Sequence, residues 1–257
     1  MKTVCVIPAR MGSARFPGKP LAPLLGMPLV LHVWNRCRLC QGFERVIVAT
    51  CDAEIRAAVE ASGGEAVMTA TTHERATDRT QEAVALLDLS LADDDFVLMV
   101  QGDEVLMAPA MADEMLAAYS RGRPPVINLA ARLHRTEDYE DANTVKVVAA
   151  PDGRALYFSR APIPSRARAA DLQAFQQTGV IGFSWSFLRR FSELPQTPLE
   201  KTESVDMLRV IEHGYDIQLV FTDSETIGVD TEADRVRAEE LLRTDPVTRR
   251  YLGFGTD

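Results

Sequence analysis

The sequence predicts an α/β protein in which helices flank a mainly parallel sheet, with a second, smaller lobe. Three observations lead to this prediction. Over the first half of the chain, short apolar runs alternate with segments of helical periodicity, a rhythm typical of βαβ units. A loop rich in glycine and cations follows the first apolar run. After about residue 133 the rhythm changes to a hairpin pattern and an irregular segment rich in Arg and Pro.

The first apolar run, Val4–Ile7, predicts a buried strand, and Pro8 is expected to end it because proline has no N–H for a strand ladder. Glycines allow the backbone to approach a ligand closely, and backbone N–H groups with fixed cations form an anion site. A strand that leads into such a loop is where α/β proteins hold phosphates. The alternative is a solvated basic turn. The loop residues concerned are Arg10, Gly12, Arg15, Gly18 and Lys19.

The other elements of the first half follow from periodicity and from cap and breaker residues. In order, they are a helix from Pro28 that Gly42 closes, a strand Arg45–Ala49, a helix Ala53–Ala61 capped by Asp52 and ended by Gly63 and Gly64, a strand Ala66–Met68, a helix from about Asp78 to Leu89, a strand Phe96–Val100, and a helix from Pro109 that the segment 122–125 breaks.

The second half combines strands with a helix and a long irregular segment. A turn at Pro151, Asp152 and Gly153 has the signature of a hairpin. The expected elements are strands 145–148 and Ala155–Ser159, an irregular segment 161–170, a strand 179–185, a helix 200–214, a strand 217–221 and a C-terminal helix 232–243 that returns to the first lobe. The whole chain, 1–257, is expected to be one domain.

Composition narrows the class of protein. The chain has 257 residues, of which 46% are hydrophobic and 25% charged, as in an ordinary globular protein. Its net charge of −9 argues against nucleic acid or an anionic membrane as the main partner. It contains no apolar run of about 18 residues and no signal peptide, so a cytoplasmic location is expected. The pair Cys37 and Cys40 is a weak zinc signal, and reduced structural thiols are expected.

Several segments together resemble a known family. The pattern I-P-A-R…S-x-R-x-P-G-K-P, over residues 7–20, is similar to the signature of sugar-activating nucleotidyltransferases, in particular the CMP-KDO synthetases (3-deoxy-manno-octulosonate cytidylyltransferases). The remaining matches occur in the same order along nearly the whole chain. They are V-Q-G-D-E at 100–104, V-K-V-V at 145–148, L-Y-F-S-R at 156–160 and G-V-D-T at 228–231.

The resemblance implies a fold like that of the nucleotide-diphospho-sugar transferases (GT-A-like). Residues 1–133 and 225–245 would form the nucleotide-binding lobe, and residues 134–224 the lobe that binds the acceptor and makes a homodimer. The implied substrates are CTP and an anionic acceptor, with Mg²⁺ as cofactor. Asp103 follows a predicted buried strand, where a carboxylate can hold Mg²⁺ with phosphate oxygens, and Asp230 is the second such carboxylate. Without the resemblance, either could be turn chemistry.

A reaction at an α-phosphorus needs a neutralised triphosphate, a held pyrophosphate and an in-line nucleophile. The resemblance assigns catalytic roles to Arg10, Lys19, Asp103 and Asp230. The residues expected to bind the nucleotide are Pro8, Ala9, Arg10, Arg15, Lys19, His73, Thr77, Arg79 and Gln101. His73 is expected to be structural rather than catalytic. Arg75 and Ala76 depart from the family segment H-x-S-G-T-E-R, and cytosine is still the expected base.

The acceptor side departs most from the family. Gln101 and Arg160 match the family's acceptor contacts, whereas Gln177 and Ile181 replace a His and a Tyr, and Asp206 and Met207 replace a Glu and a Gln. A site that lost hydrogen-bond partners for a polyhydroxylated sugar would bind it about 1–3 kcal/mol more weakly per unpaired hydroxyl. Sequence drift without a change of substrate is the alternative reading.

We therefore expect a cytidylyltransferase whose acceptor is a small anion such as a phosphonate (phosphonoformate-like), with synthesis of CMP-KDO or activation of another acidic or amino sugar acid as the alternative. A catalytically inactive nucleotide-binding module is a further alternative. It is disfavoured because Lys19, Asp103 and Asp230 are all present.

Overall fold

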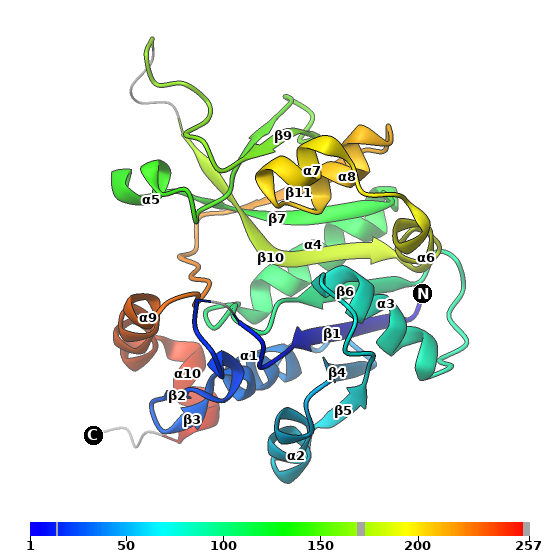
Figure 1. Ribbon diagram of the computed structural model, residues 1–257, viewed down its shortest axis with the longest axis vertical. Helices are drawn as coiled ribbons and strands as arrows, with labels where there is room; N and C mark the ends of the chain where they lie inside the picture. The colour runs from blue at the N-terminus through cyan, green and yellow to red at the C-terminus, as the bar shows by residue number, and fades with distance from the viewer. Residues whose placement is uncertain (14, 169–172, 254–257) are drawn as a thin grey trace.

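The computed structural model describes residues 1–13, 15–168 and 173–253. Its centre is a nine-stranded sheet with the order β11-β7-β10-β6-β1-β4-β5, to which β8 and β9 are added beside β10 (Figure 1). The strands are β1 (Thr3–Ala9), β4 (Arg45–Thr50), β5 (Glu65–Met68), β6 (Phe96–Val100), β7 (Val126–Arg132), β8 (Lys146–Ala149), β9 (Ala155–Ser159), β10 (Phe175–Ser184) and β11 (Ile217–Thr222). A two-stranded ribbon, β2 (Pro23–Leu24) and β3 (Met27–Pro28), follows the first loop.

Helices cover both faces of this sheet. The helices are α1 (Leu29–Arg38), α2 (Ala53–Ala61), α3 (Ala76–Leu86), α4 (Pro109–Gly122), α5 (Thr136–Glu140), α6 (Trp185–Glu193), α7 (Pro198–Glu203), α8 (Met207–Glu212), α9 (Glu232–Thr244) and α10 (Pro246–Leu252), with the 3-10 turn η1 at Lys19–Leu21. Side chains of α1, α2, α4 and α9 enter one hydrophobic core, and those of α3, α6 and α8 enter the other. The two cores share the strands because successive strand residues point to opposite faces.

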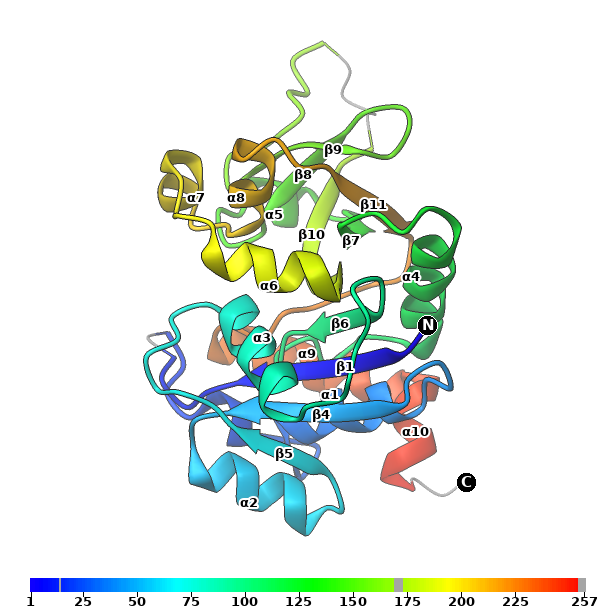
Figure 2. The same cartoon turned by 90° about the vertical axis from the view of Figure 1, so that its right-hand side faces the viewer.

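The sheet is mainly parallel, as predicted, but one long strand runs against the others. Strands β1, β4, β5 and β6 pair in parallel, as do β7 and β11. Strand β10 is antiparallel to β6, β7 and β8, and it joins the strands of the first half to those of the second (Figure 2). The hairpin predicted at Gly153 is confirmed by the antiparallel pair β8 and β9. The division into two lobes stays a prediction, since one sheet runs through both.

Pro8 does not end the first strand, contrary to the prediction. Strand β1 continues to Ala9, and Pro8 pairs with Ala49 of β4. The carbonyl of Pro8 accepts a hydrogen bond from Gly102 N, on the side of β6, at 3.2 Å. The N and C=O of one strand residue point to the same side, so the nitrogen of Pro8 also faces β6. The pairing of β1 with β6 stops at Val6, and therefore no ladder hydrogen bond is lost for want of an N–H at Pro8.

Other elements differ from the prediction at their ends or in number. Helix α1 ends at Arg38, well before Gly42, and α3 begins at Ala76 and ends at Leu86. The helix expected at 200–214 is two short helices, α7 and α8, because Ser204 adopts a left-handed conformation with φ 53°. Strand β7 and helices α5, α6 and α10 were not predicted. Of the irregular segment 161–170, residues 169 and 170 lie outside the described part.

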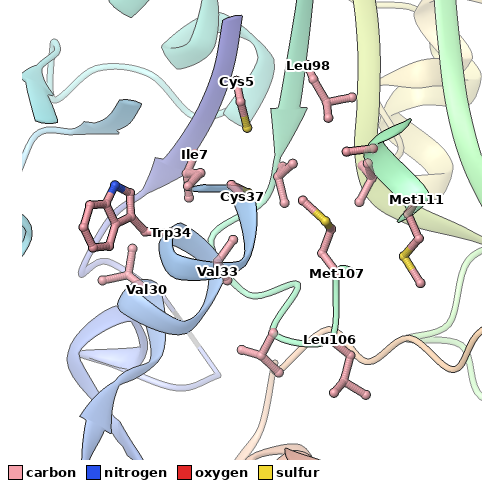
Figure 3. Close-up of a cluster of buried hydrophobic side chains, with 14 of the residues drawn as sticks. Cys5, Ile7, Val30, Val33, Trp34, Cys37, Leu98, Leu106, Met107 and Met111 are labelled. Atoms are coloured by element: carbon pink, nitrogen blue, oxygen red, sulfur yellow. The ribbon is translucent and has the colours of Figure 1, made fainter. Parts of the chain in front are cut away.

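The core between the sheet and helices α1, α2, α4 and α9 contains three of the cysteines, Cys5, Cys37 and Cys40. Cys5 and Cys37 lie with Ile7, Val33 and Trp34 between β1 and α1 (Figure 3). Burial raises the pKa of the Cys37 and Cys40 thiols, which keeps them protonated and unreactive. All four cysteines are free, in agreement with the expected reduced thiols. Within the described residues, no helix is long and apolar enough to cross a membrane.

Helix α10 is fastened to α1 by buried polar contacts. His32 of α1 is fully buried, and its Nε2 lies 2.8 Å from the Leu24 carbonyl while its Nδ1 lies 2.8 Å from the Tyr251 hydroxyl. A neutral ring that donates from Nε2 and accepts at Nδ1 satisfies both partners. Burial lowers the pKa of His32 below its usual 6.5, so the ring stays neutral in the folded protein.

This burial predicts a loss of stability in mild acid. Below pH 6.5 the unfolded chain binds a proton at His32 more readily than the folded chain, so the free energy of unfolding falls as the pH falls, by at most about 1.4 kcal/mol per pH unit. Urea unfolding of the wild type and of His32→Gln between pH 7.5 and 5 measures this. The wild type is expected to lose more stability than the variant, and parallel curves would contradict the prediction.

Candidate functional site

A cleft of about 630 Å³ opens at the carboxyl ends of β1 and β6. Residues of β10, of the segment before β8 and of the junction between α7 and α8 also line it, together with residues of the first loop between positions 10 and 19. Figures 1 and 2 show how these elements are arranged. The predicted site residues that line the cleft are Pro8, Ala9, Arg10, Lys19, His73, Arg79, Gln101, Asp103, Arg160, Gln177, Asp206 and Asp230. Arg15 and Thr77 contact lining residues through hydrogen bonds.

The backbone holds the two predicted metal carboxylates together. Asp103 follows β6, and its carbonyl accepts a hydrogen bond from Val229 N at 3.2 Å. Glu104 and Gly228 form an isolated antiparallel bridge beside this contact. The segment that carries Asp230 is therefore tied to the loop that carries Asp103, although the two are far apart in the chain. Gly102 lets the same loop lie close against the end of β1, since a Cβ there would lie 3.0 Å from the Pro8 carbonyl oxygen.

Asp230 is also fixed by the helix that follows it. Thr231 is the N-cap of α9, and its side chain accepts a hydrogen bond from Asp234 N. The Asp234 carboxylate in turn accepts hydrogen bonds from the backbone N–H groups of Asp230 and Thr231, at 3.1 and 2.8 Å. This reciprocal capping box sets the start of the helix and leaves the Asp230 carboxylate facing the cleft.

Lys19 lies between the two carboxylates. Its Nζ is 2.6 Å from Asp103 Oδ2 and 3.0 Å from Asp230 Oδ1. Burial alone would lower the pKa of Lys19, but the charges of Asp103 and Asp230 raise it above its usual value, so the ammonium is charged at neutral pH. Arg15 adds a second cation to Asp230, at 2.8 Å, and donates to the Asn143 side chain at 2.6 Å.

The segment 73–79, expected to bind the nucleotide, has polar side chains that mostly find partners within the protein. His73 Nε2 lies 2.6 Å from the Glu82 carboxylate, and Arg10 donates to the His73 carbonyl at 3.3 Å. The contact with Glu82 agrees with a structural role for His73. Arg79 is buried and donates to the Thr69 hydroxyl, whereas its Nη2 has no partner among the described residues. An unpaired buried donor beside a cleft is able to bind a ligand acceptor.

Of the residues expected to bind the acceptor, Arg160 and Asp206 line the cleft. Arg160 lines the cleft and is held by the carbonyls of Glu203 (2.6 Å) and Ala142 (2.9 Å). Asp206 accepts a hydrogen bond from the Thr77 hydroxyl at 2.7 Å. Burial raises the pKa of Asp206. The contact between Thr77 and Asp206 joins the α7–α8 junction to α3.

The expectation that Ile181 and Met207 face the acceptor is corrected. Their side chains are 1% and 0% exposed and pack in the core between the sheet and α3, α6 and α8. Neither residue lines the cleft. Their apolar character is therefore required by packing and does not describe the acceptor.

Two contributors to the site were missed at the sequence level. Glu104 is 6% exposed, lines the cleft, and accepts a hydrogen bond from Gly179 N of β10. Burial, with the neighbouring charge of Asp103, raises the pKa of Glu104 to about 7. Asp52, expected to cap α2, instead accepts from Met11 N of the phosphate loop at 2.8 Å. A signal for Glu104 was present in the segment V-Q-G-D-E, whereas nothing local pointed to the role of Asp52.

Comparisons with known proteins find similar proteins over nearly the full chain. A family model described as cytidylyltransferase matches residues 4–218. A 3-deoxy-manno-octulosonate cytidylyltransferase of Syntrophobacter fumaroxidans is 44% identical over 250 residues, covering 96% of this chain and 99% of that protein. An 8-amino-3,8-dideoxy-manno-octulosonate cytidylyltransferase of a Shewanella species is 38% identical over 244 residues, covering 94% and 99%. A solved structure of CMP:2-keto-3-deoxy-manno-octonic acid synthetase complexed with CTP superposes with a TM-score of 0.86 at 35% identity, covering 95% and 99%.

Proposed function

Because the chain belongs to the cytidylyltransferase family, we propose that it transfers CMP from CTP to a 3-deoxy-octulosonic acid and releases pyrophosphate. The observation that carries the proposal is the meeting of Lys19, Asp103 and Asp230 in a cleft that also contains Arg160. The relatives that activate octulosonic acids match over nearly the full chain and support the acceptor. The argument for a phosphonate rested partly on Ile181 and Met207, which do not reach the cleft.

Mg²⁺ is part of this proposal, and the residues present fit it. Two carboxylates, Asp103 and Asp230, already converge on one cation, the Lys19 ammonium. Mg²⁺ commonly takes one or two protein carboxylates together with substrate phosphates and water. The described residues contain no group of three or more His, Cys, Asp or Glu placed to hold a metal, so phosphate oxygens would complete the set. When bound, Mg²⁺ would neutralise charge on the triphosphate.

The side chains of the cleft divide the remaining work. Arg10, Arg15 and Lys19 would bind the phosphates, the arginines as two-pronged donors and the lysine as a compact charge. A hydroxyl oxygen of the acceptor, after its proton has passed to water, forms a bond to the α-phosphorus while the bond from that phosphorus to pyrophosphate breaks. Negative charge builds on the departing pyrophosphate, and fixed cations stabilise it without having to reorganise. Arg160 and Gln101 would align the acceptor carboxylate.

A panel of acceptors tests the proposed function. Pyrophosphate release is measured with CTP and Mg²⁺ and, in turn, 3-deoxy-manno-octulosonate, its 8-amino-3,8-dideoxy analogue and phosphonoformate. We expect a kcat/KM for at least one sugar acid that is about 100-fold or more above that for phosphonoformate, and in the range of about 10⁴–10⁶ M⁻¹s⁻¹ typical of enzymes. Preference for phosphonoformate would overturn the proposed acceptor.

Arg160 gives a more local prediction. Its guanidinium is held in place by two backbone carbonyls, so it is preorganised to bind a carboxylate. Arg160→Ala is expected to raise the KM for the sugar acid about 100-fold, since a charge-assisted contact is lost, while the KM for CTP changes less than threefold. Arg154→Ala, which removes an exposed arginine near Asp216, is the control. Equal effects on both substrates would contradict an acceptor role.

A further inference from the structure

Strand β10 contains a bulge at the edge of the cleft. Gln177 pairs with Ala130 of β7, and Ile181 pairs with Asn128, so four steps along β10 match two steps along β7. Two extra residues are thus accommodated between these pairs. Before the bulge, Gln177 lines the cleft, and after it Ile181 lies in the core between the sheet and the helices.

Asn128 fills the bulge from the neighbouring strand. It is fully buried, and its Nδ2 lies 3.1 Å from each of three carbonyl oxygens, those of Leu129, Thr178 and Val180. The Thr178 hydroxyl donates to the Leu129 carbonyl at 2.9 Å. Backbone groups that a regular ladder would have paired therefore find side-chain partners.

The cleft side of the bulge is held by the loop after β6. Gly179 N donates to the Glu104 carboxylate, and the Gly179 carbonyl accepts from Gln101 N at 2.9 Å. A Cβ at position 179 would lie 2.8 Å from Gln101 Cβ, so only glycine allows this approach. The bulge consequently joins the loop after β6, through Gln101 and Glu104, to the strand that carries Gln177.

The amide of Asn128 has only one favourable orientation. Rotating it by half a turn would place its oxygen against three carbonyl oxygens. Asn128 Oδ1 therefore faces Gln177, whose Nε2 donates to it at 2.9 Å. This fixes the second amide as well, because the reverse orientation of Gln177 would bring two oxygens together. No described residue donates a hydrogen bond to Gln177 Oε1.

We infer that Asn128 is a positioning residue that turns the carbonyl oxygen of Gln177 toward the acceptor, where it receives a hydrogen bond from a donor on the sugar acid. The donor is a hydroxyl or a protonated amine, the chemistry that separates an octulosonate from its amino analogue. This inference rests on the proposed function. It assigns a role to Asn128, a buried residue that touches neither substrate.

A double-mutant cycle tests the inference. Asn128→Ala, Gln177→Ala and the double variant are compared with the wild type for the KM of CTP and of both sugar acids. Loss of one hydrogen bond predicts an acceptor KM about tenfold higher in each single variant, with the KM for CTP within twofold. If Asn128 acts through Gln177, the double variant is no more than about twofold worse than Gln177→Ala. Multiplying effects would overturn the inference.

A second pair of variants covers the case in which Asn128→Ala no longer binds CTP. In Gln177→Glu an oxygen remains that can accept a hydrogen bond from the sugar acid, and in Gln177→Met it is lost. Both variants lose the donor to Asn128 Oδ1, so the loss of that donor is not part of the comparison. The ratio of kcat/KM for the amino sugar acid to that for the hydroxyl sugar acid is expected to rise at least fivefold in Gln177→Glu and to stay within twofold of wild type in Gln177→Met. Equal ratios in the two variants would show that position 177 does not accept from the substrate, and would overturn the inference.

The proposed function and this inference fail differently. If the wild-type enzyme turns over neither sugar acid, the proposed function is wrong, and so is the inference that rests on it. A wild-type enzyme that turns over a sugar acid, combined with additive losses in the cycle or equal ratios at position 177, leaves the function intact and removes the inference alone.

Discussion

Asp103→Asn is expected to lower kcat about 10³-fold while the protein remains folded. The change removes one of two carboxylates that converge at the ends of β1 and β6, and a bound metal supplies several kcal/mol of charge stabilisation in the transition state. The amide keeps the shape of the side chain and an oxygen, so the contacts of the Asp103 backbone with Val229 and Val105 are retained. The Mg²⁺ concentration for half-maximal rate should rise together with the loss of kcat.

The matched control is Asp93→Asn. Asp93 is an exposed carboxylate that pairs with Arg189, away from the cleft, and exposed ion pairs contribute about 0–1 kcal/mol. Its activity should equal that of the wild type within twofold. Turnover of Asp103→Asn close to the wild-type value at saturating Mg²⁺ would show that Asp103 does not hold the metal.

Lys19→Met is expected to lower kcat about 10²-fold, with a rise of less than tenfold in the KM for CTP. Lys19 is held by Asp103 and Asp230 and carries a full charge at neutral pH. That charge is felt most strongly as pyrophosphate departs, so its loss should affect the transition state more than the bound substrate. Lys19→Arg keeps the charge and should recover part of the activity. An effect confined to KM would limit Lys19 to nucleotide binding.

The same variant has a thermodynamic signature that does not depend on catalysis. Without the ammonium, Asp103 and Asp230 face each other, and Arg15 is the one cation among the described residues that still pairs with either of them. Mg²⁺ should then bind between them more readily and raise the Tm of Lys19→Met more than that of the wild type. Combining Lys19→Met with Asp103→Asn should abolish this extra stabilisation. The same rise in the double variant would place the bound ion elsewhere.

The first half of the fold could be predicted because its signals are local. The apolar runs around Val6, Ile47 and Leu98 are long enough to specify buried strands, and they do form neighbouring parallel strands. That Asp103 and Asp230 belong to one site could be predicted from the sequence only through the resemblance to a family. Their actual convergence depends on the contact between Val229 and the Asp103 carbonyl, which connects distant parts of the chain.

Strand β7, and which side chains of β10 lie in the core, could not be predicted for a different reason. The segment of β7 contains Asn128, a residue rare in strands, whose side-chain N–H groups donate to two carbonyls of β10 that are distant in sequence. The register of β10 against β7 shifts between Gln177 and Ile181, and Ile181, which aligned with a substrate contact in the family, lies in the core. Alternation along a strand is informative only when its register is known.

Product identification in a mixed incubation tests the central claim most directly. The enzyme is given ATP, CTP, GTP and UTP at equal concentration, with Mg²⁺ and the two octulosonic acids, and the products are identified by mass spectrometry. A cytidylyltransferase with the cleft described above should form CMP esters of a sugar acid together with pyrophosphate, and esters of the other nucleotides at about 1% or less, as expected for a site that recognises the base by hydrogen bonds. A uridylyl or adenylyl ester as the main product, or no ester at all, would contradict the account.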